Sequence, residues 1–166
     1  MPKKASTRSS ASKSTKHIDS LSANEFRVEV DGEVVDGVFK VGGLAPYKLD
    51  VKQSSALKIN KDPITVVKMV RRDPNNVVNR WLRESIATHT DIMRVTRTVS
   101  VVAVDDGEEI RRWNIKGAWI SGVSYSEFDT AKGELVEEKL TLQWEAIETL
   151  WPDLADSEHQ LPAKTK

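Results

Sequence analysis

The sequence predicts a mainly β domain, a small antiparallel β-barrel or sandwich with one α-helix. Apolar and polar residues alternate along most of the chain, which is the pattern of half-buried strands. Asp31-Gly32 and Asp106-Gly107 stand between alternating segments, where they favour tight hairpin turns. Only one segment repeats apolar residues at helical spacing. Many strands with a single helix indicate a small β architecture whose helix covers one opening.

The first predicted element is a hairpin. Phe26, Val28 and Val30 alternate with charged residues, and after Asp31-Gly32 the chain returns as a second strand over residues 34–41. Beyond Gly42-Gly43, alternation predicts further strands at 47–52 and 64–69. The strand at 64–69 is apolar on both sides, so we expect it to be buried on both faces.

The single predicted helix covers residues 74–87. Asp73 is a favourable N-cap, Pro74 suits the first helical position, and an apolar stripe follows. The stripe consists of Val77, Val78, Trp81, Leu82 and Ile86.

Four strands are predicted after the helix, at 93–104, 109–116, 118–125 and 135–148. The last one separates its residues cleanly into two faces. The apolar face, expected in the core, holds Val136, Leu140, Leu142, Trp144 and Ala146. The polar face, expected in water, holds Glu137, Lys139, Thr141, Gln143 and Glu145.

Composition divides the chain into three parts. Residues 1–22 are rich in Ser and Lys and predict a flexible basic tail, residues 23–149 form the β domain, and residues 150–166 read as a C-terminal tail. Apolar runs are too short for a membrane-spanning helix, and the N-terminus has no signal-peptide pattern. We therefore expect no membrane insertion by this chain.

The residues offer little for catalysis or cofactor binding. The 166 residues include no Cys, and the three histidines, His17, His89 and His159, are isolated from one another. We expect no catalytic, metal-binding or cofactor-binding residues. The adjacent glutamates 108–109 and 137–138 point to opposite faces of their strands, which favours solvated carboxylates.

Nucleic-acid binding is the alternative from a different functional class. The 25 basic and 25 acidic residues balance, which argues against binding by the chain as a whole. Under this alternative, binding would come from the basic N-terminal arm or from cationic residues around the helix start. These cations are Lys68, Arg71, Arg72, Arg80 and Arg83.

Four ordered motifs resemble the tail tube proteins of contractile phages and related contractile injection systems, which share the Hcp-like fold. The motifs are NEFRVEVDG at 24–32, VGGL at 41–44, RWNIKGAW at 112–119 and ELVEEKLTLQWE at 134–145. The resemblance covers residues 24–148 and includes the helix containing Trp81. It implies a core that contains Phe26, Val28, Trp81, Trp113, Trp119, Leu140 and Leu142.

The resemblance implies a structural, non-enzymatic role. Six subunits would close into a ring whose inner wall is a continuous sheet, and rings would stack into a tube within a sheath. DNA, a tape-measure protein or a protein effector would pass through the channel, and sheath, tape-measure and baseplate or spike proteins would be partners. The subunit would be made in the cytoplasm and then become part of a virion tail or injection particle. The polar face from Glu137 to Glu145 is the candidate wall strand.

One departure from the family pattern concerns residues 50–62, which lack the usual Gly and Pro. This segment is the candidate for contact between rings or subunits, through Leu49, Val51, Leu57 and Ile59. The change would suit a diverged tube subunit or the initiator subunit at the baseplate. A secreted Hcp-like ring of a type VI secretion system is a further alternative.

Overall fold

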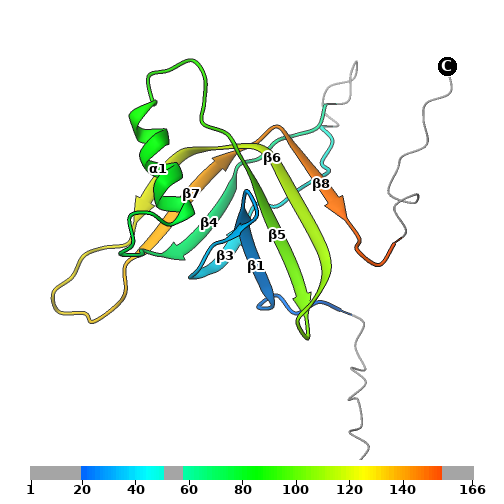
Figure 1. The fold of residues 1–166 in the computed structure, drawn as a ribbon, viewed down its shortest axis with the longest axis horizontal. Coiled ribbons are helices and arrows are strands. Elements are labelled where there is room, and N and C mark those ends of the chain that lie inside the picture. Colours follow the sequence, from blue (N-terminus) through cyan, green and yellow to red (C-terminus); the bar gives the residue numbers. More distant parts are fainter. Residues whose placement is uncertain (1–19, 51–57, 155–166) are drawn as a thin grey trace, which may run out of the picture.

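The computed structural model describes residues 20–50 and 58–154 and contains eight strands and one helix there (Figure 1). The elements are β1 (Phe26–Val30), β2 (Glu33–Val34), β3 (Val38–Gly42), β4 (Ile64–Met69), α1 (Val77–Ala87), β5 (Arg97–Asp105), β6 (Glu108–Tyr125), β7 (Glu137–Gln143) and β8 (Ala146–Leu150). Every strand pair is antiparallel. The predicted fold class, mainly β with one helix, is confirmed.

The strands follow the order β2-β1-β5-β6-β7-β4-β3, with β8 added beside β6. The long strand β6 connects two half-sheets. Its first half pairs with β5 and β8, and its second half pairs with β7. We call the strands β2, β1, β5, β8 and the first half of β6 half-sheet A. The second half of β6 with β7, β4 and β3 is half-sheet B.

A glycine in the middle of β6 allows this change of sheet. Gly117 has φ +62°, and the pairing with β5 shifts between Arg97 and Val99, so β6 carries a bulge here. Two separate strands were predicted at 109–116 and 118–125, which is wrong because the bulge bends β6 without ending it. The bulge also changes which residues face inward: Ile115 and Ala118 are both fully buried.

The predicted return strand at 34–41 is divided between the two half-sheets. Val34 pairs with β1, whereas β3 pairs with β4. Between them Gly37 has φ +77°, and its carbonyl accepts a hydrogen bond from the Met69 amide at 3.0 Å. A glycine in the left-handed region lets the chain cross from one half-sheet to the other.

The predicted last strand, 135–148, is also two strands. β7 ends at Gln143, the chain bends at Glu145, and β8 begins on a different partner. The bend reverses the alternation, so Ala146 is exposed although it was expected in the core. Trp144 is buried, and its indole Nε1 donates to the carbonyl of Asp62 at 2.9 Å.

Two further boundaries differ from the prediction. The strand expected from residue 93 begins at Arg97, because Met93 lies exposed in the preceding loop. The strand expected at 47–52 is reduced to one bridge between Leu49 and Ile59, and residues 51–57 lie outside the described part of the chain.

The helix ends where predicted but begins three residues later. Asn76 is its N-cap and accepts a hydrogen bond from the Asn79 amide at 2.9 Å. Asp73, the predicted cap, instead accepts from the Asn75 amide in the preceding turn. The fully buried Trp81 donates its indole N–H to the Val95 carbonyl at 2.9 Å. No helix in the described residues is long and apolar enough to cross a membrane.

The hydrophobic core lies between the half-sheets and under the helix. Of the predicted core residues, four are buried: Val28, Trp81, Leu140 and Leu142. Phe26 and Trp113 pack against this core and are partly buried. Trp119 is not among the residues of the core, because the bulge at Gly117 changes its face, and its ring lies 5.2 Å from the Arg94 guanidinium.

Candidate functional site

The strand β7, which lies between β6 and β4 in half-sheet B, has one polar face and one buried face. Glu137 and Lys139 are exposed, and Thr141 and Gln143 are partly exposed on the same side. These four predicted wall residues therefore lie together on the outer face of half-sheet B. Glu145 does not join them, because it lies in the bend beyond β7, where its amide donates to the Lys116 carbonyl at 3.0 Å.

The neighbouring strands extend this face sideways. Lys139 lies between Val67 of β4 and Ser124 of β6, and Val67 lies beside Lys40 of β3. The next row is small and neutral, with Thr141 between Thr65 and Gly122. The face therefore combines hydroxyl groups, small side chains and the partly exposed Val67 and Met69 with few charges of both signs.

The inner face of the same strands contains an ion pair that the sequence analysis missed. Lys68 and Glu138 are opposite each other on β4 and β7, and the Nζ to Oε1 distance is 3.1 Å. Their side chains are 1% and 3% exposed, so the expected solvated position of Glu138 is wrong. The sequence does contain an indication of this buried position, because Lys68 alternates in phase with Ile64 and Val66, which are buried.

Tyr125 continues this row from β6, where it is opposite Glu138. Burial and the adjacent Glu138 carboxylate raise the pKa of the Tyr125 phenol. Lys68 also donates to the Met69 carbonyl at 2.9 Å. A row of polar groups thus closes the core at the end of β4.

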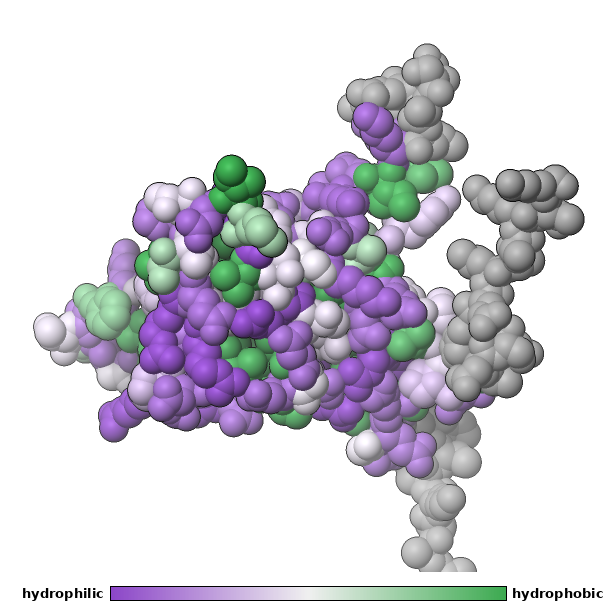
Figure 2. Space-filling model, turned by 45° about the horizontal axis from the view of Figure 1, so that its top comes forward, coloured by the Kyte–Doolittle hydropathy of each residue, from purple (hydrophilic) through white to green (hydrophobic). Residues whose placement is uncertain are grey.

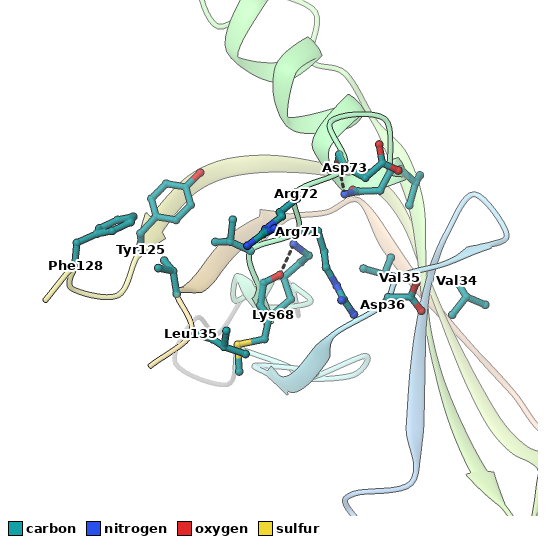
Figure 3. A pocket seen from close by; sticks show the side chains of 15 residues that line it. Val34, Val35, Asp36, Lys68, Arg71, Arg72, Asp73, Tyr125, Phe128 and Leu135 are labelled. Atoms are coloured by element: carbon teal, nitrogen blue, oxygen red, sulfur yellow. Dashed lines mark hydrogen bonds between the residues drawn. The ribbon is translucent and has the colours of Figure 1, made fainter. Parts of the chain in front are cut away.

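A groove of about 1130 Å³ lies over this end of the core (Figure 3). Figure 3 shows the Tyr125 and Phe128 rings on one side and Val34 to Asp36 on the other, with Lys68 and Arg71 between them. Its walls contain large exposed apolar side chains, with Phe128 81% and Leu135 73% exposed. Such a hollow has the character of a protein-binding surface.

At the other end of β4 the chain forms a projection, which we call the arm, described at residues 47–50 and 58–62. Two backbone hydrogen bonds hold its sides together, from Asp50 to Lys58 at 3.0 Å and from Asn60 to Lys48 at 2.7 Å. Of the predicted contact residues, Leu49 and Ile59 face each other here, whereas Val51 and Leu57 lie outside the described residues. In Figure 2 hydrophilic side chains dominate the visible face, and a hydrophobic group marks the projection at the upper right.

The outer face of half-sheet A contains a network of four charges. Arg112 binds Glu29 at 2.8 Å and Glu109 at 2.6 Å, and Arg27 binds the same two carboxylates. The hydrogen bond from Arg112 lowers the pKa of Glu29, against the opposing effect of burial. The hydrogen bond from Arg112 likewise lowers the pKa of Glu109. Because the two arginines and the two glutamates pair with one another, we interpret this cluster as a structural ion-pair network.

The cations around the helix start do not form one binding surface. Lys68 is buried, and Arg80 pairs with Glu33 at 2.9 Å, whereas Arg71 and Arg72 line the groove. His89 contacts the Ile86 carbonyl through Nδ1 at 2.8 Å. Among residues 20–50 and 58–154, no group of three or more metal-ligating side chains is assembled.

Comparison with known families gives one match that covers most of the chain. The model of the family described as T4-like virus tail tube protein gp19 matches residues 22–148. No curated protein matches the chain.

Solved structures with the same fold come from several injection machines. The sheath-tube complex of PVC, an extracellular contractile injection system, contains a chain with 16% identity and a TM-score of 0.61, and the match covers 80% of this chain and 93% of that one. The tube-terminating cap of the anti-feeding prophage gives 15% identity, a TM-score of 0.66 and coverage of 85% and 97%. Hcp1 from Flavobacterium johnsoniae gives 11% identity, a TM-score of 0.50 and coverage of 75% and 94%.

Proposed function

The chain belongs to the T4-like virus tail tube protein family, and from this we propose that it closes into hexameric rings that stack into the inner tube of a contractile particle. Its role is that of a structural tube protein. The proposed particle is a phage tail or an injection system, with sheath and baseplate proteins around the tube. The subunit would be made in the cytoplasm and act without catalysis.

The observation that carries this proposal is the outer face of half-sheet B. Four strands present a surface on which charged, hydroxyl-bearing and small side chains surround Val67 and Met69 of β4, and the residues of β7 have hydrogen-bonded strands on both sides. Rigid strands with small polar groups suit the wall of a water-filled channel. DNA or a protein effector could slide along this wall because its few charges have both signs.

The sheet edges support closure into a ring. β3 and β8 each pair with a single neighbour in the described chain. Unpaired edges of this kind favour strand pairing with another copy. Pairing of two different edges is a heterologous contact, which generates a ring when the rotation closes.

A cysteine-labelling experiment tests the wall assignment. The chain has no cysteine, so Lys139→Cys introduces a unique thiol on the proposed channel wall. In assembled tubes we expect a small maleimide to label this thiol while a maleimide on a bulky polymer reacts much more slowly. In dissociated subunits both reagents should react equally. Arg83→Cys, on the exposed side of α1, is the matched control.

The outcome is read together with electron microscopy of the same sample. Rings or tubes with a central hole are expected in negative stain, and rings that never stack would instead favour the initiator subunit. Equal reactivity of Lys139→Cys toward both reagents in intact tubes would exclude this face from the channel. A monodisperse monomer at all concentrations would contradict the assembly itself.

A further inference from the structure

We propose that the loop between α1 and β5, residues 88–96, docks into the groove beside Phe128 of a second copy of this chain. We call this segment the α1–β5 loop. The inference rests on the proposed tube function and adds a contact between successive copies. Such a contact needs two different surfaces on each subunit, because a heterologous contact that does not close by rotation extends into a filament. The groove and the α1–β5 loop are two such surfaces.

The groove exposes apolar side chains that the subunit itself does not cover. Val34, Val70, Tyr125, Phe128 and Leu135 line it, and each is at least 43% exposed. Apolar side chains gathered around one hollow are typical of a surface that another protein covers. The groove is therefore suited to receive an apolar projection.

The α1–β5 loop presents such a projection. Ile92 is 100% exposed and Met93 is 84% exposed, the two highest values among the large apolar side chains of the described residues. Figure 1 shows the loop extending beyond the C-terminal end of α1, at the top of the view. Docking of this pair in the groove removes apolar surface of both copies from water, which favours the contact.

Hydrogen bonds hold the loop on both sides of this apolar pair. The Asp91 amide donates to the Thr88 carbonyl at 2.9 Å, and Arg94 donates to the His89 carbonyl at 3.0 Å. The Arg94 guanidinium also lies 5.2 Å from the centroid of the Trp119 ring. A loop that is already ordered in the free subunit loses little conformational freedom when it binds.

The charges beside the two apolar surfaces are opposite in sign. Asp91 precedes the apolar pair of the loop, whereas Arg71 and Arg72 line the groove. Within the described residues, no ion pair joins any of these three side chains to a group of opposite charge. An acidic group on one surface and basic groups on the other favour contact between loop and groove over contact between two loops.

Two aspartates also line the groove, but neither forms an ion pair with the arginines. Asp73 accepts a hydrogen bond from the Asn75 amide at 2.9 Å, and Asp36 lies on the wall opposite the aromatic rings (Figure 3). The Arg71 guanidinium lies against Gly37, where an added Cβ atom would be 3.0 Å from Nη2. Arg72 is therefore the cation that we assign to Asp91 of the second copy.

The two surfaces lie near opposite ends of β7. Val136, which precedes β7, lines the groove. At the other end of β7, Gln143 is opposite Trp119, the residue whose ring contacts Arg94 of the loop. Because β7 belongs to the proposed channel wall, contacts at its two ends join successive rings.

Substitutions on the two surfaces test the inference. Ile92→Asp changes the loop and Phe128→Asp changes the groove, and both residues are exposed, so the subunit should still fold. We expect each variant to form rings and to lose tubes in negative stain, with thermal unfolding unchanged. Ile86→Asp is the control, because Ile86 is 58% exposed on α1 but belongs to neither surface; its tubes should keep their normal length.

The other outcomes of this experiment are distinct. Tubes of normal length from Ile92→Asp or Phe128→Asp would overturn the proposed contact, and so would loss of the rings themselves. Rings of the unmodified chain that never stack would also overturn the contact but would leave the ring in place. If the unmodified chain forms neither rings nor tubes, the proposed function itself fails.

A charge exchange tests the assigned ion pair. Asp91→Arg should abolish tubes, because it brings two cations together, and adding Arg72→Asp should restore them. Thermal unfolding of both variants should match that of the unmodified chain. A double variant that folds normally and recovers no tubes would overturn the pairing of these two residues.

Disulfide trapping provides a further measurement. In the cysteine-free chain, Met93→Cys together with Leu135→Cys should give a ladder of many linked subunits when tubes are oxidised, whereas each single variant gives dimers at most. Absence of the ladder from tubes that contain both cysteines would overturn the docking of the loop in the groove.

Discussion

Lys68 and Glu138 show how one buried pair can constrain a sheet. Both side chains lie in the apolar interior, and each needs the other because an unpaired buried charge is costly. A shift of β7 by two residues would preserve its polar and apolar faces but would place Lys68 opposite Leu140 or Val136. The ion pair thus opposes slips by two residues in either direction, which alternation alone would tolerate.

This role predicts different outcomes for single and double substitutions. Glu138→Leu should lower the free energy of unfolding by about 3 to 5 kcal/mol, because it leaves the Lys68 ammonium unpaired. Adding Lys68→Met should restore most of that loss, since both charges are then gone. Urea denaturation of the two variants checks this. Equal losses in the single and double variants would show that packing, and not the charge, is responsible.

At the same scale, Arg112 predicts a dependence of stability on pH. Glu29 and Glu109 have pKa values lowered in the folded state, so their contribution is present above the ordinary carboxyl pKa of about 4.3. This stabilising contribution is lost as the pH falls through the lowered pKa values of the two carboxyls in the folded state. Arg112→Gln should therefore cost about 1.5 to 3 kcal/mol at pH 7.

The difference in the free energy of unfolding between Arg112→Gln and the unmodified chain should shrink as the pH falls below about 4.3. Urea denaturation from pH 7 to pH 3 measures it, with the exposed Arg83→Gln as the control. A difference that stays constant over this range would mean that Arg112 acts through packing of its aliphatic stem.

Among the elements, β6 decides the architecture. Its bulge at Gly117 turns an 18-residue strand from one half-sheet into the other. The backbone there has φ +62°, and a Cβ atom would lie 2.6 Å from Cδ of Glu145. Any other residue must accept the strained backbone and displace the neighbouring side chain.

Gly117→Ala should therefore lower the free energy of unfolding by about 1 to 2 kcal/mol. Gly133→Ala is the matched control, because no atom lies within 4 Å of its Cβ position; its stability should not fall. Thermal and urea unfolding of both variants test this. Similar stability for the two alanine variants would contradict the claim that the bulge requires glycine at position 117.

At the scale of the whole molecule, the outer faces of the two half-sheets differ in how their charged side chains are paired. On the outer face of half-sheet A four charged side chains pair with one another, whereas on the outer face of half-sheet B Glu137 and Lys139 are exposed. Lys139→Glu on the latter face should leave the free energy of unfolding within about 0.5 kcal/mol of the original. Circular dichroism and urea denaturation check it. Loss of folding would mean that Lys139 has a structural partner in the subunit.

The sequence determined the features that depend on neighbours along the chain. Alternation identified most strands, the helical stripe located α1, and the phase of β7 separated Glu137 and Lys139 from the buried Leu140 and Leu142. These predictions succeed because a side chain's direction follows from local backbone geometry. Turn residues such as Asp31-Gly32 act over the same short range.

Only the tertiary structure decided which strands are partners and where the alternation changes phase. The division of residues 34–41 and 135–148, and the reversal at Gly117, depend on strands far away in sequence. The same is true of the Lys68 and Glu138 pair, whose partners are 70 residues apart. Long-range pairing depends on the summed packing of the whole core, which no local pattern contains. The placement of groove and arm at opposite ends of β4 follows from that packing.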